Sequence, residues 1–248
     1  MVEKKREHKK TWFVYDANGP LFSWSPTGDA KENIDLAYRY MKNKHPNIYR
    51  KAIVENDRGA YIEMAGKLQR ATMSGELPPY TNKRMMKIAH QTKKYGGVNT
   101  VISDGDKSFL VDLMHKISEG NSPFDKENIR SSLDVGSKKD SKTWYSIFQK
   151  MGVRKGDRLY GVEDTEDNAR AMAKAAKESG LVARVYLLDQ SLLSNDARRD
   201  GDIIRIGDEE YLERKVNRHL RYHTKKKPEN AREVIALFLL SFSLLGTF

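Results

Sequence analysis

A chain of 248 residues without cysteine excludes both a disulfide framework and a thiolate metal site. A hydrophobic content of 38% supports a globular core, and the length fits one large domain or a core with an inserted subdomain. A formal net charge of +11 can attract anionic substrates, acidic partners or nucleic acid. The basic residues are dispersed, however, and no zinc-finger, RNA-recognition or Walker pattern occurs, so most of this charge is expected on solvated faces.

No targeting or membrane segment is predicted. No apolar segment follows the basic stretch 1–10, so the sequence does not predict a signal peptide there. The apolar stretch 234–245 is too short for a bilayer, which needs about 20 residues. We expect a cytoplasmic protein without membrane attachment, in which 234–245 forms a buried or interface helix able to pair subunits into a homo-oligomer.

The first elements surround an acidic turn. The apolar run 12–15 predicts a strand that delivers Asp16 to a turn containing Gly19, after which apolar residues return. Apolar spacing behind Asp29 predicts a helix over 29–44. The remaining predictions for this part are short strands at 51–54 and 60–64, a loop over 66–82 and a basic helix over 83–95.

The second half alternates strands and helices. Strands are predicted at 98–103, 158–162, 183–188 and 203–206, and helices at 108–117, 143–151 and 166–179, with a polar loop over 119–141. Such alternation predicts a parallel sheet with right-handed crossovers. The fold class is therefore α/β, with a Rossmann-like three-layer core.

Three predicted strands end in acidic or hydroxyl side chains. The first ends in Asp16, the second in Ser103 followed by Asp104, and the third in Glu163 followed by Asp164. Ligands of open α/β sheets bind at the carboxyl ends of the strands. The sequence therefore predicts a cation-assisted site assembled from distant parts of the chain.

These segments, in this order, resemble the motifs of the haloacid dehalogenase-like hydrolase superfamily. The first motif is the altered Asp16-Ala17-Asn18-Gly19-Pro20-Leu21, and the second is the strand ending at Ser103. The third is a loop lysine, for which Lys139 aligns best, and the fourth is the strand ending in Glu163-Asp164 before a helix rich in small residues. The resemblance implies a core of residues 11–23 plus 98–190, a cap inserted at 24–97, and an extension of unknown role at 191–248.

The resemblance also implies roles for these residues. Asp16 would be a nucleophile that forms an aspartyl intermediate later cleaved by water, with Ser103 bonded to the transferring oxygen and Lys139 offsetting negative charge. The substrate would be a small phosphorylated molecule. The implied ligands of Mg²⁺ are Asp16, the backbone carbonyl of Asn18, Asp164 and Glu163, and the implied phosphate-binding positions are Asn18, Gly19, Asp104 and Gly105.

Three departures from the family motifs leave the activity open, and one of them is Asn168 or Ala169 where an acid often follows the aspartate of the fourth motif. Asn18 stands where phosphatases of the superfamily carry a second aspartate as general acid and base, and Pro20 replaces the usual threonine. Asn18 favours a 2-haloacid dehalogenase-type hydrolase, whereas Glu163-Asp164 favours a cation site. Two further hypotheses are an impaired member that binds nucleic acid or an acidic partner through its charge, and a metal-dependent nuclease of the flap or PIN type, which the Ser103 and Lys139 segments fit poorly.

Overall fold

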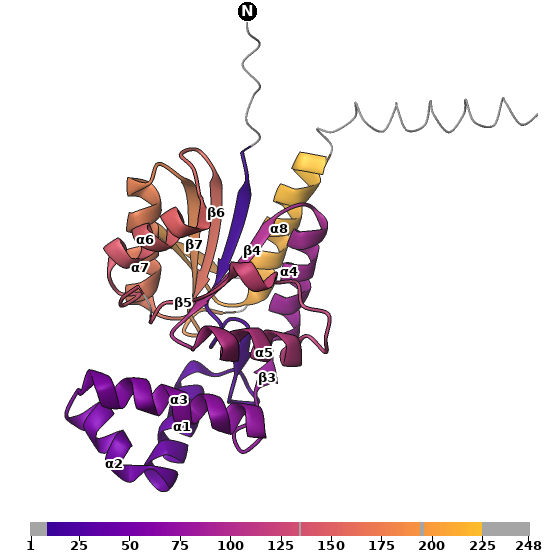
Figure 1. Ribbon diagram of the computed structural model, residues 1–248. Helices are drawn as coiled ribbons and strands as arrows, with labels where there is room; N and C mark the ends of the chain where they lie inside the picture. The colour runs from indigo at the N-terminus through magenta and orange to yellow at the C-terminus, as the bar shows by residue number, and fades with distance from the viewer. Residues whose placement is uncertain (1–8, 134, 194–195, 225–248) are drawn as a thin grey trace, which may run out of the picture.

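The computed structural model describes residues 9–133, 135–193 and 196–224, which form a sheet flanked by helices and a smaller helical lobe at one end of it (Figure 1). The sheet has seven strands, and every neighbouring pair is parallel except the last. From edge to edge they are β5 (Ile129–Ser131), β4 (Val98–Ser103), β1 (Thr11–Tyr15), β6 (Arg158–Glu163), β7 (Val182–Leu188), β9 (Ile203–Ile206) and β8 (Ala197–Asp200). The predicted α/β class is confirmed.

Strand β1 lies in the middle of the sheet and is buried on both faces. Phe13 and Tyr15 pack into one hydrophobic cluster, while Val14 between them packs into a second cluster on the opposite face. This alternation follows from the pleat of a strand, whose successive side chains point to opposite faces. Tyr15 is in register with Val101 of β4 and Val162 of β6, so the polar residues that follow these three strands emerge at one edge.

Helices cover both faces and make the three predicted layers (Figure 1). One face carries α4 (Lys83–Lys94), α5 (Lys107–Ile117) and α8 (Glu209–Thr224), and the other carries α6 (Ser141–Met151) and α7 (Glu166–Glu178). The alanine-rich stripe of α7 allows close packing against the sheet, because Ala169, Ala173 and Ala176 are all buried there.

The smaller lobe consists of α1 (Ala30–Lys44), α2 (Pro46–Tyr49), a π-helical segment η1 (Arg50–Val54) and α3 (Arg58–Ser74). It has its own hydrophobic cluster, formed by Ala37, Met41, Ala52, Ala60, Met64, Leu68, Ala71 and Leu77. Two short antiparallel strands, β2 (Phe22–Ser23) and β3 (Tyr80–Thr81), lie where the chain enters and leaves this lobe. A 3₁₀ turn, η2 (Lys126–Asn128), precedes β5.

The predicted strands at 51–54 and 60–64 are wrong, because η1 and α3 occupy these residues, and the predicted loop over 66–82 is wrong as far as Ser74, where α3 ends. Ala60, Met64 and Leu68 recur every fourth residue and form the buried face of α3. The Asp57 side chain accepts a hydrogen bond from the Ala60 N–H at the start of this helix. Short apolar runs are compatible with a strand or a helix. Packing against α1 and α2 stabilises the helix here.

Two predicted ranges contain segments that pack with the main sheet. Helix α4 lies within 24–97, and its buried residues belong to the cluster around Phe13 and Tyr15. Strand β9 and helix α8 lie within 191–248, and β9 pairs with β7. The apolar stretch 234–245 lies outside the described residues. Each helix of the described part is too short or too polar to cross a bilayer.

Candidate functional site

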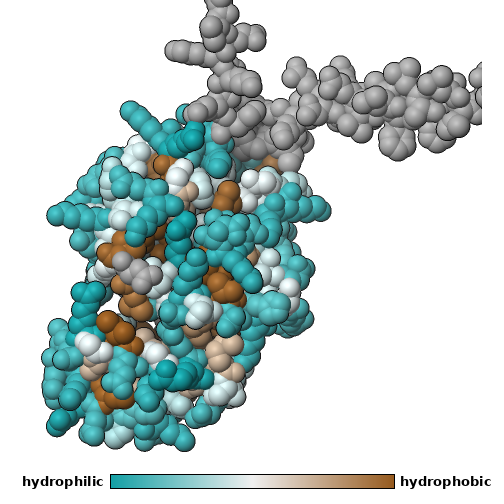
Figure 2. All heavy atoms as spheres, viewed as in Figure 1, coloured by the Kyte–Doolittle hydropathy of each residue, from teal (hydrophilic) through white to brown (hydrophobic). Residues whose placement is uncertain are grey.

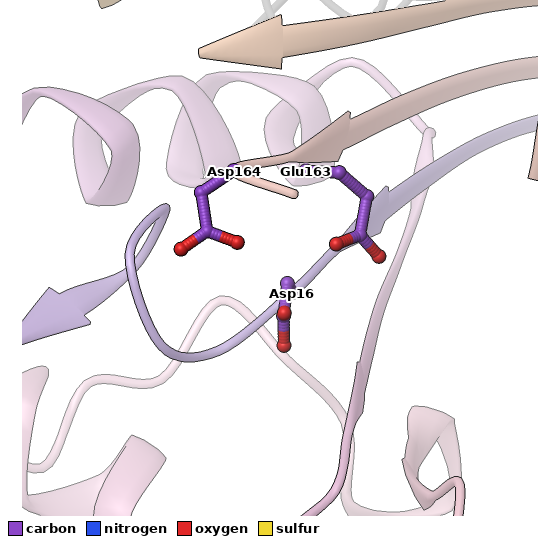
Figure 3. Close-up of side chains that lie close together, drawn as sticks. All are labelled: Asp16, Glu163 and Asp164. Carbon is purple, nitrogen blue, oxygen red and sulfur yellow. The ribbon is translucent and has the colours of Figure 1, made fainter. Parts of the chain in front are cut away.

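Three carboxylates meet at the carboxyl edge of the sheet. Asp16 follows β1 directly, Glu163 ends the neighbouring β6, and Asp164 is the next residue (Figure 3). Each offers an oxygen within 4.8 Å of oxygens from the other two. The parallel pairing of β1 with β6 brings them together across nearly 150 positions of sequence, as their strand-end positions predict.

A buried lysine completes this carboxylate cluster. The Lys138 Nζ lies 2.5 Å from Asp16 Oδ2 and 3.5 Å from Glu163 Oε1, and the Lys138 side chain is 3% exposed. The Trp144 indole N–H donates to the Lys138 carbonyl at 2.7 Å, which fixes the loop that carries the lysine.

Lys138 takes the place expected for Lys139. The Lys139 side chain is 65% exposed, and its Nζ lies 3.3 Å from Asp167 Oδ2. An irregular loop precedes α6, so neighbouring side chains take directions that no sequence period predicts. The lysine beside Asp16 is therefore Lys138, and Lys139 is a surface residue.

Burial and mutual charge set the protonation of the cluster. Burial alone would lower the pKa of Lys138, but the carboxylates of Asp16, Glu163 and Asp104 together raise it, so the lysine stays charged. Burial raises the pKa of Glu163 well above its usual range, against the opposing charge of Lys138. Burial, followed by the charge of Asp16, raises the pKa of Asp164 to about 6.

The donor set suits a hard divalent cation. The three carboxylates carry more negative charge than Lys138 neutralises, and all their ligand atoms are oxygens. Mg²⁺ prefers such oxygen donors and is commonly bound through one or two carboxylates. The residues present therefore fit the cation that the fold motifs imply, with buried Asp16 and partly exposed Asp164 as the carboxylates of the cluster that line the cavity.

Gly19 lets the loop after β1 pass directly beside Asp164. Its φ of +85° lies in the left-handed region, and a Cβ at this position would stand 2.2 Å from Asp164 Oδ2. The loop is closed by hydrogen bonds from the Leu21 and Phe22 N–H groups to the Ala17 carbonyl. The lack of a side chain at Gly19 therefore permits this close approach.

We expect Gly19→Ala to displace Asp164 and weaken cation binding by at least about tenfold, because a ligand moved by an ångström loses much of its interaction. The left-handed backbone adds a destabilisation of about 1 kcal/mol. Gly75→Ala is the matched control, since Gly75 has a φ of +87° and no atom of the described residues within 4 Å of its Cβ position. Calorimetric Mg²⁺ titration of both variants checks this; equal affinities would contradict the assigned contact.

The Asn18 side chain is held by a second asparagine that lies on α1. The Trp24 N–H donates to Asn33 Oδ1 at 2.7 Å, which identifies the oxygen of Asn33. The Asn33 Nδ2 then donates to Asn18 Oδ1 at 2.8 Å. This network fixes the orientation of the Asn18 amide, which coordinates alone leave open. Asn33 is 2% exposed, so the orientation is fixed by a buried group.

Ser103, Asp104 and Gly105 lie on the same edge and line the same cavity as Asp16. Ser103 ends β4 and is mostly buried. The Ser132 hydroxyl donates to Asp104 Oδ1, which ties this turn to the segment after β5. A Cβ on Gly105 would lie 3.0 Å from the side chain of α5 that packs on it, so glycine permits the close approach of this helix. The structure thus brings the predicted phosphate-binding positions other than Gly19 to one cavity.

A cavity of about 300 Å³ separates this edge from the helical lobe. Asp16, Asn18 and Lys138 line its floor, while Tyr61 of α3 and Ile34 of α1 belong to its opposite wall. Burial, followed by the charge of Asp104, raises the pKa of the Tyr61 hydroxyl. This residue of the lobe therefore interacts electrostatically with a carboxylate of the core. Figure 2 shows hydrophobic residues of the lobe beside the hollow that separates it from the core.

A second cavity of about 440 Å³ lies behind the Gly19–Asp164 contact. Both cavities include Asp164, but Asp16 and Lys138 line only the first. The pair of Asp16 and Lys138 therefore lies at the smaller cavity.

Sequence reasoning missed Lys138, Asn33 and Tyr61. Lys138 carried a signal, since it precedes Lys139 in the same motif. Asn33 lies on the helix predicted at 29–44, and Tyr61 lies in the range 60–64, predicted as a strand. Both ranges fall between the motifs, and only the packing of the lobe against the sheet edge brings these residues to the site.

No protein-family model matches the sequence, and no curated protein matches it. Several solved structures are similar to this chain. One dehalogenase structure covers 86% of this chain and 97% of its own, at 11% identity and a TM-score of 0.51. A dehalogenase solved with an intermediate complex covers 82% of this chain and 96% of its own, at 11% identity and a TM-score of 0.52.

This chain has the haloacid dehalogenase-like fold. A Had-superfamily hydrolase from Ehrlichia chaffeensis is a further neighbour, at 14% identity and a TM-score of 0.49, covering 85% of this chain and 97% of its own. In this haloacid dehalogenase-like fold, the carboxylate cluster lies at the ends of the two central strands β1 and β6.

Proposed function

We propose that this protein is a phosphate-ester hydrolase in which Asp16 is the nucleophile and Mg²⁺ is the cofactor. The observation that carries the proposal is the Asp16 carboxylate on the cavity floor, paired with buried Lys138 and surrounded by two further carboxylates. A surface turn aspartate would need none of these partners. The 24–97 segment would act as the cap that encloses a small phosphorylated substrate.

Both oxygens of the Asp16 carboxylate are held in place. The Ala17 N–H donates to Oδ1 at 2.7 Å, and Lys138 holds Oδ2 at 2.5 Å. A positioned carboxylate attacks phosphorus with less reorganisation than a free one. The fixed positive charge of Lys138 favours the approach of a phosphate to a carboxylate, which would otherwise repel it. Ser103 would donate a hydrogen bond to a phosphoryl oxygen.

The residues that would hold Mg²⁺ are Asp16, Asp164, the backbone carbonyl of Asn18 and, behind them, Glu163. When bound, the cation would neutralise charge on the phosphate. The Asn168 Nδ2 donates to Glu163 Oε2 at 3.4 Å, which orients Glu163.

The direct test is release of phosphate from 4-nitrophenyl phosphate. We expect turnover with Mg²⁺ and none after EDTA treatment, with activity restored by added Mg²⁺. Absence of turnover across a broad panel of phosphate esters would contradict the proposal.

A 2-haloacid dehalogenase is the second candidate, because Asn18 removes the expected proton-transfer residue. It predicts halide release from 2-chloropropionate without added metal. The carboxylate cluster favours the phosphatase, since a dehalogenase has no need of a cation.

Mg²⁺ is expected to stabilise the fold in a pH-dependent way. Asp164 has a folded pKa of about 6, above its unfolded value, so the metal-free protein loses stability as pH rises from about 4 through 6. Bound Mg²⁺ reverses this loss and competes with protons. We therefore expect a larger Mg²⁺-induced rise in melting temperature at pH 7.5 than at pH 5. Thermal melts with Mg²⁺ or EDTA measure it, and an equal or larger shift at pH 5 would contradict the cation site.

A further inference from the structure

Asn18 lines the site with an amide, which carries hydrogen-bond donors but no transferable proton. Its oxygen accepts from Asn33 Nδ2 at 2.8 Å, so its nitrogen is the amide atom left to face other groups. Asn18 lines the cavity together with Asp16 and Lys138. An amide does not ionise near neutral pH, so it stabilises a developing negative charge without protonating it.

Much of the cavity wall is aromatic and apolar. The ring-bearing residues that line it are Phe22, Trp24, Tyr38, Tyr61 and Phe109. The Trp24 indole N–H donates to Thr72 Oγ1 at 3.0 Å, and the Phe22 and Trp24 rings pack edge to face with centroids 5.7 Å apart, so this wall is preformed. Tyr61 and Ile34 are 41% and 49% exposed, which leaves apolar surface for a ligand to cover. A volume of about 300 Å³ lies at the small end of ligand sites and suits a single ring.

Charge in the cavity selects against a second anionic group. Asp16, Asp104 and Asp164 line it, and Lys138 is the single cationic side chain among the described lining residues. Lys138 already pairs with Asp16, and a cation would serve the phosphate. A substrate carboxylate or second phosphate would find no further cationic side chain among the described lining residues and would meet Asp104 instead.

From these observations we infer that the substrate is an aryl phosphate with an uncharged ring, whose phenolate leaves without help from a general acid. This inference rests on the proposed function. The phosphoryl group would lie on the floor beside Asp16, and the ring would lie against Tyr61 and Trp24. A phenolate is a stable enough anion to depart when Asn18 merely donates a hydrogen bond, whereas an alkoxide needs a proton.

The reaction balances without an additional reagent. An Asp16 oxygen forms a bond to phosphorus, and the bond from phosphorus to the aryl oxygen breaks with its electron pair on that oxygen. Water then attacks phosphorus, and the bond to Asp16 breaks with its electrons returned to the carboxylate. Dihydrogen phosphate forms, and one of its protons passes to the phenolate, which gives hydrogen phosphate and the phenol.

The experiment compares kcat/KM for phenyl phosphates of graded leaving-group acidity with that for benzyl phosphate, which carries the same ring on an alkyl oxygen. In the full-length protein with Mg²⁺ we expect faster turnover from more acidic phenols, and benzyl phosphate at least about 100-fold slower than phenyl phosphate. Asn18→Asp should raise benzyl phosphate turnover at least about tenfold and flatten the leaving-group dependence. The Asn33 amide can donate to this aspartate as it does to Asn18, so the fold is expected to tolerate it.

A separate substrate comparison tests whether the cavity excludes a second anionic group. A carboxylate on the para position of phenyl phosphate should lower kcat/KM at least about tenfold, although it makes the phenol more acidic, because an unpaired charge in the cavity is costly.

The outcomes separate the two proposals. Equal turnover of benzyl and phenyl phosphate would overturn the leaving-group inference and leave the proposed phosphatase activity intact. Faster turnover of the para-carboxylate ester would overturn the charge argument and also leave the phosphatase activity intact. No turnover of any aryl phosphate would overturn the inference, and no turnover of benzyl phosphate or the wider panel of phosphate esters either would overturn both. The wild-type comparison decides the inference even if Asn18→Asp does not fold.

Discussion

Replacing Asp16 with asparagine is expected to lower turnover of aryl phosphates at least about 10⁴-fold, since an amide oxygen cannot serve as the nucleophile. The fold should persist. An asparagine oxygen can still accept from Lys138 or Ala17, and loss of one charge relieves repulsion with Glu163 and Asp164. Steady-state assays with melting curves measured in parallel separate chemistry from stability.

Asp167→Asn is the matched control for Asp16→Asn. It makes the same chemical change at a carboxylate that is 64% exposed and pairs with Lys139 on the surface. Such exposed ion pairs contribute about 0–1 kcal/mol, so neither activity nor stability should change much. Retention of wild-type activity by folded Asp16→Asn would reject Asp16 as the nucleophile.

Lys138→Met is expected to lower kcat about 10²- to 10³-fold, the loss typical when one preorganised charge or donor is removed. It should also destabilise the fold by about 3 kcal/mol near neutral pH, because Asp16 and Glu163 lose their buried partner. Burial raises the pKa of Glu163, so protonation neutralises this carboxyl as pH falls. The destabilisation should therefore shrink as pH falls towards 5, which urea titrations at two pH values measure.

Lys139→Met distinguishes the two adjacent lysines. The Lys139 side chain is exposed, whereas that of Lys138 is 3% exposed beside Asp16. We expect the Lys139 variant to retain wild-type activity and stability. An inactive Lys139→Met beside an active Lys138→Met would invert the assignment and restore the expectation from sequence.

Sequence patterns predicted well those site residues that lie at the ends of strands. Apolar runs that stop at Asp16, Ser103 and Glu163 identify β1, β4 and β6, and parallel pairing then brings their ends together. This inference needs only the period of a strand and the handedness of crossovers. Asp16, Glu163 and Asp164 could therefore be placed near one another without a structure.

Residues that depend on irregular loops or on packing between distant helices could not be placed this way. The choice between Lys138 and Lys139 depends on side-chain direction in a loop pinned by Trp144. The helical state of 58–74 depends on burial of its apolar face against α1 and the π-helical segment, which short apolar runs do not reveal. The contact from Asn33 to Asn18 links two elements that have no shared sequence motif.

The division into a core, a cap at 24–97 and an extension from 191 stays a prediction. It has a physical basis in the separate hydrophobic cluster of α1 to α3, whose residues pack on one another rather than on the sheet. Opening of this lobe would admit the substrate to the cavity beside Asp16, and closing would exclude water from it.

The most direct measurement is acid quenching of the enzyme during turnover of 4-nitrophenyl phosphate, followed by mass spectrometry of its peptides. We expect a phosphoryl group on the peptide that contains Asp16, present during turnover and lost once substrate is exhausted. Phosphate release without any phosphorylated peptide, or with the phosphoryl group on another residue, would contradict a covalent role for Asp16.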